Sequence, residues 1–104
     1  MRGEYKVRGG KLVAVDLEVA NGVITQAFLS GDFFIEPDSA LEDINASLPG
    51  LSVLASVSDI ADAITTNLSP GVALIGFTPE AVGIAVRRAL GHATSWDDHT
   101  FDVI

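Results

Sequence analysis

The sequence contains no cysteine among its 104 residues. Disulfides, thiolate metal sites and cysteine nucleophiles are therefore excluded, and nothing requires an oxidising compartment. No apolar run approaches the ~18 residues of a membrane-spanning helix, because Gly71, Gly76 and Pro79-Glu80 interrupt the most apolar region. The N-terminus also lacks the apolar core of a secretory signal. We therefore expect a cytoplasmic protein.

Basic side chains are scarce, with six against fourteen acidic ones and a formal net charge of −8. Most of such a surface repels polyanions, which argues against binding to nucleic acid or to an anionic membrane. Four of the six basic residues fall within the first eleven positions: Arg2, Lys6, Arg8 and Lys11. One end of the molecule is therefore expected to be locally positive.

A twisted hairpin is the clearest element that the sequence predicts. Apolar residues alternate over 11–19 as in a half-buried strand, and Asn21-Gly22 is typical of a tight turn between antiparallel strands. In the returning strand, Ile24 is out of phase with Leu29, which favours one inserted residue, a β-bulge, near Thr25-Gln26. Residues 32–35 are then expected to turn back as a short third strand.

Three helices are expected after the hairpin. Each has local signals at its ends, such as the Thr78-Pro79-Glu80 start of the last helix and the Pro49-Gly50 stop of the first. A short apolar run before the last helix predicts a buried strand or an extended connection. The helices are expected at about 36–48, 56–68 and 78–90, and the apolar run at 72–77.

These elements predict an α+β domain, in which about three helices pack on one face of a small three-stranded antiparallel sheet, a β-meander. A chain of this length is expected to form one domain with a modest core. We assign that domain to residues 1–91. Residues 92–104 show no helical period and are interpreted as a C-terminal tail that packs on the domain or on a partner.

Catalytic and metal-binding groups are not indicated. His92 and His99, with the aspartates between and after them, have the ligand types of a metal site, but no predicted helix aligns them. No serine lies in a G-x-S-x-G setting, so nothing supports nucleophilic catalysis. We predict no catalytic residue and no metal ligand.

Two polar corners that contain glycine flank the hairpin, at Gly9-Gly10-Lys11-Leu12 and Gly31-Asp32-Phe33-Phe34. The first is either a flexible entry to a strand or a place where backbone amides approach an anion while Lys11 and Lys6 supply charge. In the second, Asp32 either caps a turn or has a binding role. One phenylalanine is expected to point inward and the other outward, as a candidate anchor for a partner.

These two corners, in this order, resemble the C-terminal accessory domain of lipoate-protein ligases. The resemblance covers about residues 5–91 and extends to Glu36-Pro37 and to the Ile75–Glu80 entry into the last helix. Because the sequence starts at a methionine with no catalytic domain in front of it, we expect a stand-alone accessory subunit.

Members of that family activate lipoate with ATP to lipoyl-AMP and pass the lipoyl group to a lysine of an acceptor domain. The resemblance therefore implies a non-catalytic subunit of a ligase, which forms a heterodimer with the catalytic subunit and enables the adenylation step. ATP with Mg and lipoate would bind in that complex, and no cofactor would bind this chain alone. Lipoyl acceptor domains would be indirect partners.

The resemblance also assigns residues. Lys11, with Gly9 and Gly10, matches the position that faces the large domain, where it would approach the ATP phosphates or order the loop that covers them. The interface with the catalytic subunit is expected to include Lys6, Asp32, Phe33 and Phe34.

Three other interpretations are open. The shape also resembles the iron–sulfur scaffold and sulfur-acceptor proteins, although cluster chemistry requires the cysteines that this chain lacks. The chain could instead be a non-catalytic protein-interaction module, or an inactive remnant of a ligase.

Overall fold

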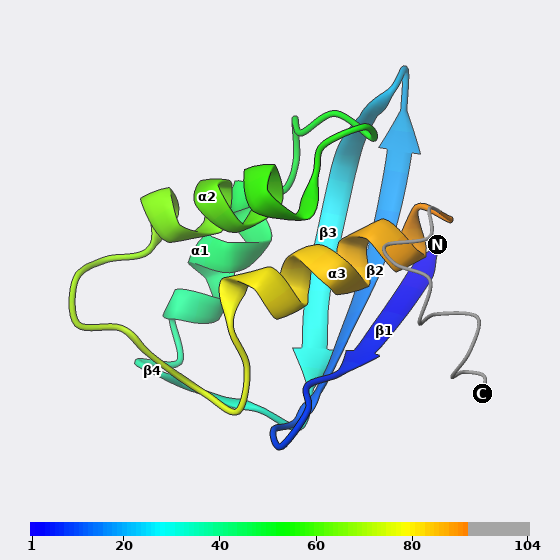
Figure 1. Cartoon of the computed structure of the whole chain (residues 1–104). Coiled ribbons are helices and arrows are strands. Elements are labelled where there is room, and N and C mark those ends of the chain that lie inside the picture. The colour runs from blue at the N-terminus through cyan, green and yellow to red at the C-terminus, as the bar shows by residue number, and fades with distance from the viewer. Residues whose placement is uncertain (92–104) are drawn as a thin grey trace.

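A three-stranded antiparallel sheet forms one layer of the molecule in the computed structural model, which describes residues 1–91 (Figure 1). The strands β1 (Arg2–Lys6), β2 (Leu12–Ala20) and β3 (Val23–Gly31) lie in that order. The predicted hairpin is β2–β3. Its turn has positive φ at both central residues, 55° at Asn21 and 82° at Gly22, as this kind of tight turn requires.

The predicted β-bulge is present in β3. Glu18 lies opposite Gln26, whereas Val19 lies opposite Ile24, so Thr25 is the extra residue. With this insertion, Ile24 and Leu29 both reach the buried side of the sheet although an odd number of positions separates them.

The third strand of the sheet is β1 and not the segment after the hairpin. Residues 34–36 do form a strand, β4 (Phe34–Glu36), but it pairs with β5 (Ala73–Ile75) in a separate two-stranded ribbon. β1 lacks the alternation of apolar and polar side chains that is typical of a half-buried strand, because its buried residue is Gly3. A Cβ there would lie 2.2 Å from the carbonyl oxygen of Ala85, so the close approach of a helix replaces side-chain packing.

The three helices are α1 (Ala40–Ser47), α2 (Val57–Asn67) and α3 (Pro79–Ala89). α1 begins later than expected because the segment before it forms turns, in which the Ala40 amide donates to the Pro37 carbonyl at 3.0 Å. The expected helix at 56–68 is present with Ser56 as its N-cap. The Thr78 hydroxyl caps α3 as predicted, accepting from the Ala81 amide at 3.1 Å.

All three helices cover the same face of the sheet (Figure 1). α3 packs on β1 and β2, α1 packs on β3, and α2 lies against α1 and α3. The α+β prediction with helices on one face is therefore confirmed. The largest fully buried side chains lie between the sheet and the helices, and come from β2, β3, the three helices and the end of α1: Val13, Val15, Leu17, Ile24, Leu29, Ile44, Leu48, Ile60, Ile64, Val82 and Val86.

The expected burial of 72–77 is wrong for most of that run, since Ala73 and Ile75 are exposed and Phe77 is the buried residue. The reason is that β5 pairs with β4 outside the main sheet. Over residues 1–91, no helix has both the length and the apolar character needed to cross a membrane. The predicted tail, with His92 and His99, lies outside the described residues.

Candidate functional site

The two predicted corners lie side by side at one end of the sheet. The β1–β2 turn and the β3–β4 turn leave the sheet at the same end (Figure 1), and the Asp32 amide donates to the Leu12 carbonyl at 3.1 Å. Gly31 passes so close to this carbonyl that a Cβ would lie 2.1 Å from its oxygen. Glycine at position 31 therefore permits the two turns to touch.

A third segment, Gly76-Phe77 between β5 and α3, completes this group. The Gly76 carbonyl accepts a hydrogen bond from the Lys11 amide at 2.9 Å. A Cβ on Gly10 would lie 2.6 Å from the same carbonyl oxygen, and a Cβ on Gly76 would lie 2.5 Å from Lys11 Cγ. We call the three turns together, residues 6–12, 31–34 and 75–78, the basic corner.

Two backbone amides of the glycine-containing β1–β2 turn are already paired. The Gly10 amide donates to the Val7 carbonyl at 2.8 Å, and the Lys11 amide donates to Gly76. These two groups are not available to an anion. Gly10 therefore permits the close approach of Gly76, while the expected approach of Gly9 and Gly10 to the ATP phosphates stays a prediction.

The cations of the corner differ in what they contact. Lys6 Nζ donates to the carbonyls of Val7 at 3.1 Å and Gly10 at 2.8 Å, so it braces its own turn. Arg8 and Lys11 are exposed, and neither side chain has a hydrogen-bond or ion-pair partner within residues 1–91. These two charges are free to contact a partner or a ligand.

The fourth cation of the N-terminal segment lies elsewhere. Arg2 is at the other end of β1, where it forms exposed ion pairs with Glu4 at 3.0 Å and Asp16 at 2.7 Å. The hydrogen bond to Glu4 and the nearby charge of Asp16 raise the pKa of Arg2. The positive charge of the corner therefore comes from Lys6, Arg8 and Lys11.

The two phenylalanines point in opposite directions, as predicted. Phe33 is half-buried and packs against Phe77, with ring centroids 4.2 Å apart. Phe34 is 66% exposed and lies directly opposite Ile75, which is 49% exposed. Asp32 is exposed, and its carboxylate accepts no hydrogen bond from the described residues. The expected turn cap by the Asp32 side chain is therefore not observed, and only the Asp32 backbone takes part in the turn, through its amide bond to Leu12.

The corner has no set of groups that could carry out a covalent reaction. Its side chains are three cations, one carboxylate, apolar groups and the Thr78 hydroxyl, which caps α3, and no nucleophile lies next to a base. Within residues 1–91, no group of three or more histidine, aspartate or glutamate side chains could hold a metal ion. What the corner can do is present charge and apolar surface to another molecule.

Sequence reasoning did not assign site roles to Gly76, Phe77 and Ile75. A signal was present, since a glycine interrupts the apolar run between Ile75 and Phe77. Glycine within a strand pattern often marks close backbone approach. Which segment approaches it could not be known, because Lys11 is far away in the sequence.

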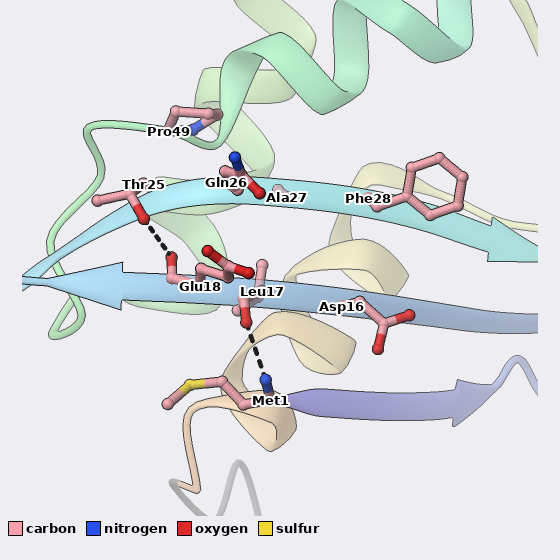
Figure 2. A pocket seen from close by; sticks show the side chains of 9 residues that line it. All are labelled: Met1, Asp16, Leu17, Glu18, Thr25, Gln26, Ala27, Phe28 and Pro49. Carbon is pink, nitrogen blue, oxygen red and sulfur yellow. Dashed lines mark hydrogen bonds between the residues drawn. The ribbon is translucent and has the colours of Figure 1, made fainter.

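A second surface feature is an open hollow on the sheet face that the helices leave uncovered (Figure 2). Its volume is about 540 Å³. Asp16 and Glu18 contribute the carboxylates, and Phe28, 60% exposed, contributes the apolar wall. The Met1 amino group, at one side, donates to the Leu17 carbonyl at 2.8 Å. This hollow brings together no catalytic pair and does not include the predicted site residues.

The fold and the corner define a small α+β protein whose site presents charge and apolar surface rather than reactive groups. No family model matches the chain, and no curated protein matches it. Among solved structures, it is similar to one chain of an archaeal lipoylation system from Thermoplasma acidophilum, which comprises a bi-partite lipoate protein ligase and its E2 lipoyl domain. The match has a TM-score of 0.63 and 26% sequence identity, and it covers 86% of this chain and 92% of that chain.

Proposed function

We propose that this chain is the accessory subunit of a bipartite lipoate-protein ligase, which docks on a catalytic subunit and enables ATP-dependent activation of lipoate to lipoyl-AMP. The observation that carries the proposal is the structural match, which spans most of both chains and involves a component of a lipoate ligase system. It is supported by the two corners of the sequence resemblance, which lie in contact.

The geometry of the corner suggests how such a subunit would act. Adenylation joins the lipoate carboxylate to the α-phosphorus of ATP and releases pyrophosphate. Negative charge therefore builds up on the departing pyrophosphate as its bond to the α-phosphorus breaks. A fixed cation near those phosphates stabilises this charge. Lys11 has this role in our proposal, because its amide is bonded to Gly76 while its side-chain charge has no partner within residues 1–91.

In this proposal the two subunits have different roles. ATP with Mg and lipoate would be held by the catalytic subunit, and the accessory chain would complete the phosphate environment or order the loop that covers it. Transfer of the lipoyl group from lipoyl-AMP to an acceptor lysine releases AMP and does not involve pyrophosphate. It would therefore depend less on this corner.

The direct test is to mix the chain with the large lipoate-ligase subunit of the same source. Lipoate-dependent exchange of pyrophosphate into ATP is then measured with and without the chain. We expect exchange to require the chain, or to rise strongly when it is added. Binding without stimulation would favour a protein-interaction module with no influence on catalysis, and absence of both would contradict the proposal.

A further inference from the structure

A pair of exposed apolar side chains lies at the edge of the basic corner, on its β4 and β5 segments. Five large apolar residues are substantially exposed in the described part of the chain: Met1, Phe28, Phe34, Leu54 and Ile75. Of these, Phe34 and Ile75 face each other directly across the antiparallel β4–β5 ribbon. Directly opposed residues place their side chains on the same face of a ribbon. They therefore form a single apolar patch.

The ribbon is fixed at the end next to the corner. Phe33 immediately precedes β4, and Phe77 lies two residues after the end of β5, so the contact between their rings joins both strands at this end. The Gly76 carbonyl, directly after Ile75, accepts a hydrogen bond from the Lys11 amide, and the Asp32 amide donates to the Leu12 carbonyl. The apolar patch is therefore preorganised, which lowers the entropic cost of binding.

The charge around this patch is opposite to that of the remaining protein. The basic corner contains Lys6, Arg8 and Lys11 against the single carboxylate of Asp32, a formal charge of +2, while the whole chain carries −8. A partner surface that bears carboxylates is attracted by this corner and repelled by most other faces. Such complementarity selects one docking orientation.

We propose that Phe34 and Ile75 are the apolar anchor, and Arg8 the charged border, of the surface through which this chain docks on the large ligase subunit. The occupant is therefore an apolar pocket of that subunit bordered by carboxylates. This inference rests on the proposed function and deepens it, because it assigns the docking surface and the chemistry of the partner's face. It adds Ile75 and Arg8 to the residues expected from the sequence.

The test is equilibrium binding of the full chain to the large subunit of the same source, measured by isothermal titration calorimetry. Ile75→Thr and Phe34→Thr remove the apolar anchor, while threonine keeps a high strand propensity. The matched control is Leu54→Thr, since Leu54 is 77% exposed but lies far from the basic corner. Its neighbour Val53 donates a hydrogen bond from its amide to the Gly22 carbonyl, in the β2–β3 turn at the other end of the sheet. Thermal unfolding establishes that each variant is folded.

We expect each anchor variant to bind about tenfold more weakly or worse, and the control to stay within about twofold of the unchanged chain. Binding should also weaken as ionic strength rises, and Arg8→Gln should reduce this salt dependence. Arg8→Gln makes the charged border testable even if the anchor variants prove unstable.

The outcomes separate this inference from the proposed function. If the unchanged chain does not bind the large subunit, the proposed function fails. If it binds, and Ile75→Thr and Phe34→Thr bind as well as the Leu54→Thr control, the docking surface lies elsewhere while the proposed function stands. If sedimentation shows that the chain alone self-associates through Ile75, the occupant is a second copy and the inference is overturned.

Discussion

Gly76 and Lys11 are in contact, and this contact connects two segments of the basic corner that are distant in the sequence. Gly76 has a φ of +92°, and a Cβ there would lie 2.5 Å from Lys11 Cγ. Gly71 has a similar φ of +87°, but a Cβ there would meet nothing within 4 Å. Alanine variants of these two glycines therefore separate the cost of backbone strain from the cost of a collision with Lys11.

We expect Gly76→Ala to lower the free energy of unfolding by about 2–3 kcal/mol, because it combines the cost of positive φ with a collision. Gly71→Ala should cost about 1 kcal/mol, from backbone conformation alone. Urea denaturation of both variants measures the difference. Equal losses would mean that the collision with Lys11 adds no cost beyond that of the positive φ.

Lys11 is the residue on which the proposed activity depends most. We expect Lys11→Ala to reduce lipoyl-AMP formation by the complex by about tenfold to a hundredfold, because a cation near the phosphates is lost. Transfer from lipoyl-AMP supplied in advance should change little. Pyrophosphate exchange and single-turnover transfer measure the two steps separately.

Lys11→Arg is the matched control for charge, since it keeps a cation on a long side chain. It should retain much more adenylation than Lys11→Ala. Equal losses of adenylation and transfer in Lys11→Ala would argue against a role at the phosphates and in favour of a role in docking.

At the scale of elements, the helix starts show how far local sequence determines structure. Ser56 and Asp59 form a reciprocal capping box at α2, with bonds of 3.0 and 3.1 Å. Ser39 also precedes a helix, α1, but its side chain makes no capping bond. Two serines in the same position relative to a helix therefore differ in their contribution.

We expect Ser56→Ala to lower the free energy of unfolding by about 1 kcal/mol, because two amides at the start of α2 lose their partners or their positioning. Ser39→Ala should have almost no effect. Thermal or chemical unfolding of the two variants tests this. A similar loss at both positions would contradict the cap assignment.

The elements with local signals were predictable, and those defined by distant contacts were not. The β2–β3 turn, the bulge at Thr25 and the Thr78 cap all follow from residues close in the sequence, and all are present. β1 was missed because Gly3, its buried residue, has no side chain. The partner of β4 was also missed, since pairing with β5 joins residues about forty positions apart, and sequence periodicity carries no such information.

At the scale of the whole molecule, the distance between helix and sheet depends on Gly3. A Cβ at this position would lie 2.2 Å from the Ala85 oxygen and 2.3 Å from the Ala89 nitrogen, both backbone atoms of α3. Shortening a neighbouring side chain cannot relieve such a collision. α3 would have to move away from β1 and from β2, whose Val13, Val15 and Leu17 belong to the core.

We expect Gly3→Ala to lower the free energy of unfolding by about 2–3 kcal/mol, with a fall in Tm of roughly 10 °C or more for a domain of this size. Calorimetry measures both. The double variant Gly3→Ala with Ala89→Gly should be no more stable, because the collision involves backbone. Recovery in the double variant would show that side-chain crowding is the cause.

The sequence by itself determined the hairpin, its bulge, two of the three helix starts and the excess of acidic side chains, because each depends on residue identity at short range. Only the tertiary structure decided that the two glycine corners touch, that Gly76 joins them, and that Phe34 lies against Ile75. These contacts join residues that are far apart in the sequence. They form because α1 and α2, which lie between β4 and β5 in the chain, pack on one side of the sheet and allow β5 to pair with β4. The candidate site is therefore a property of the fold, made from residues that the sequence shows only separately.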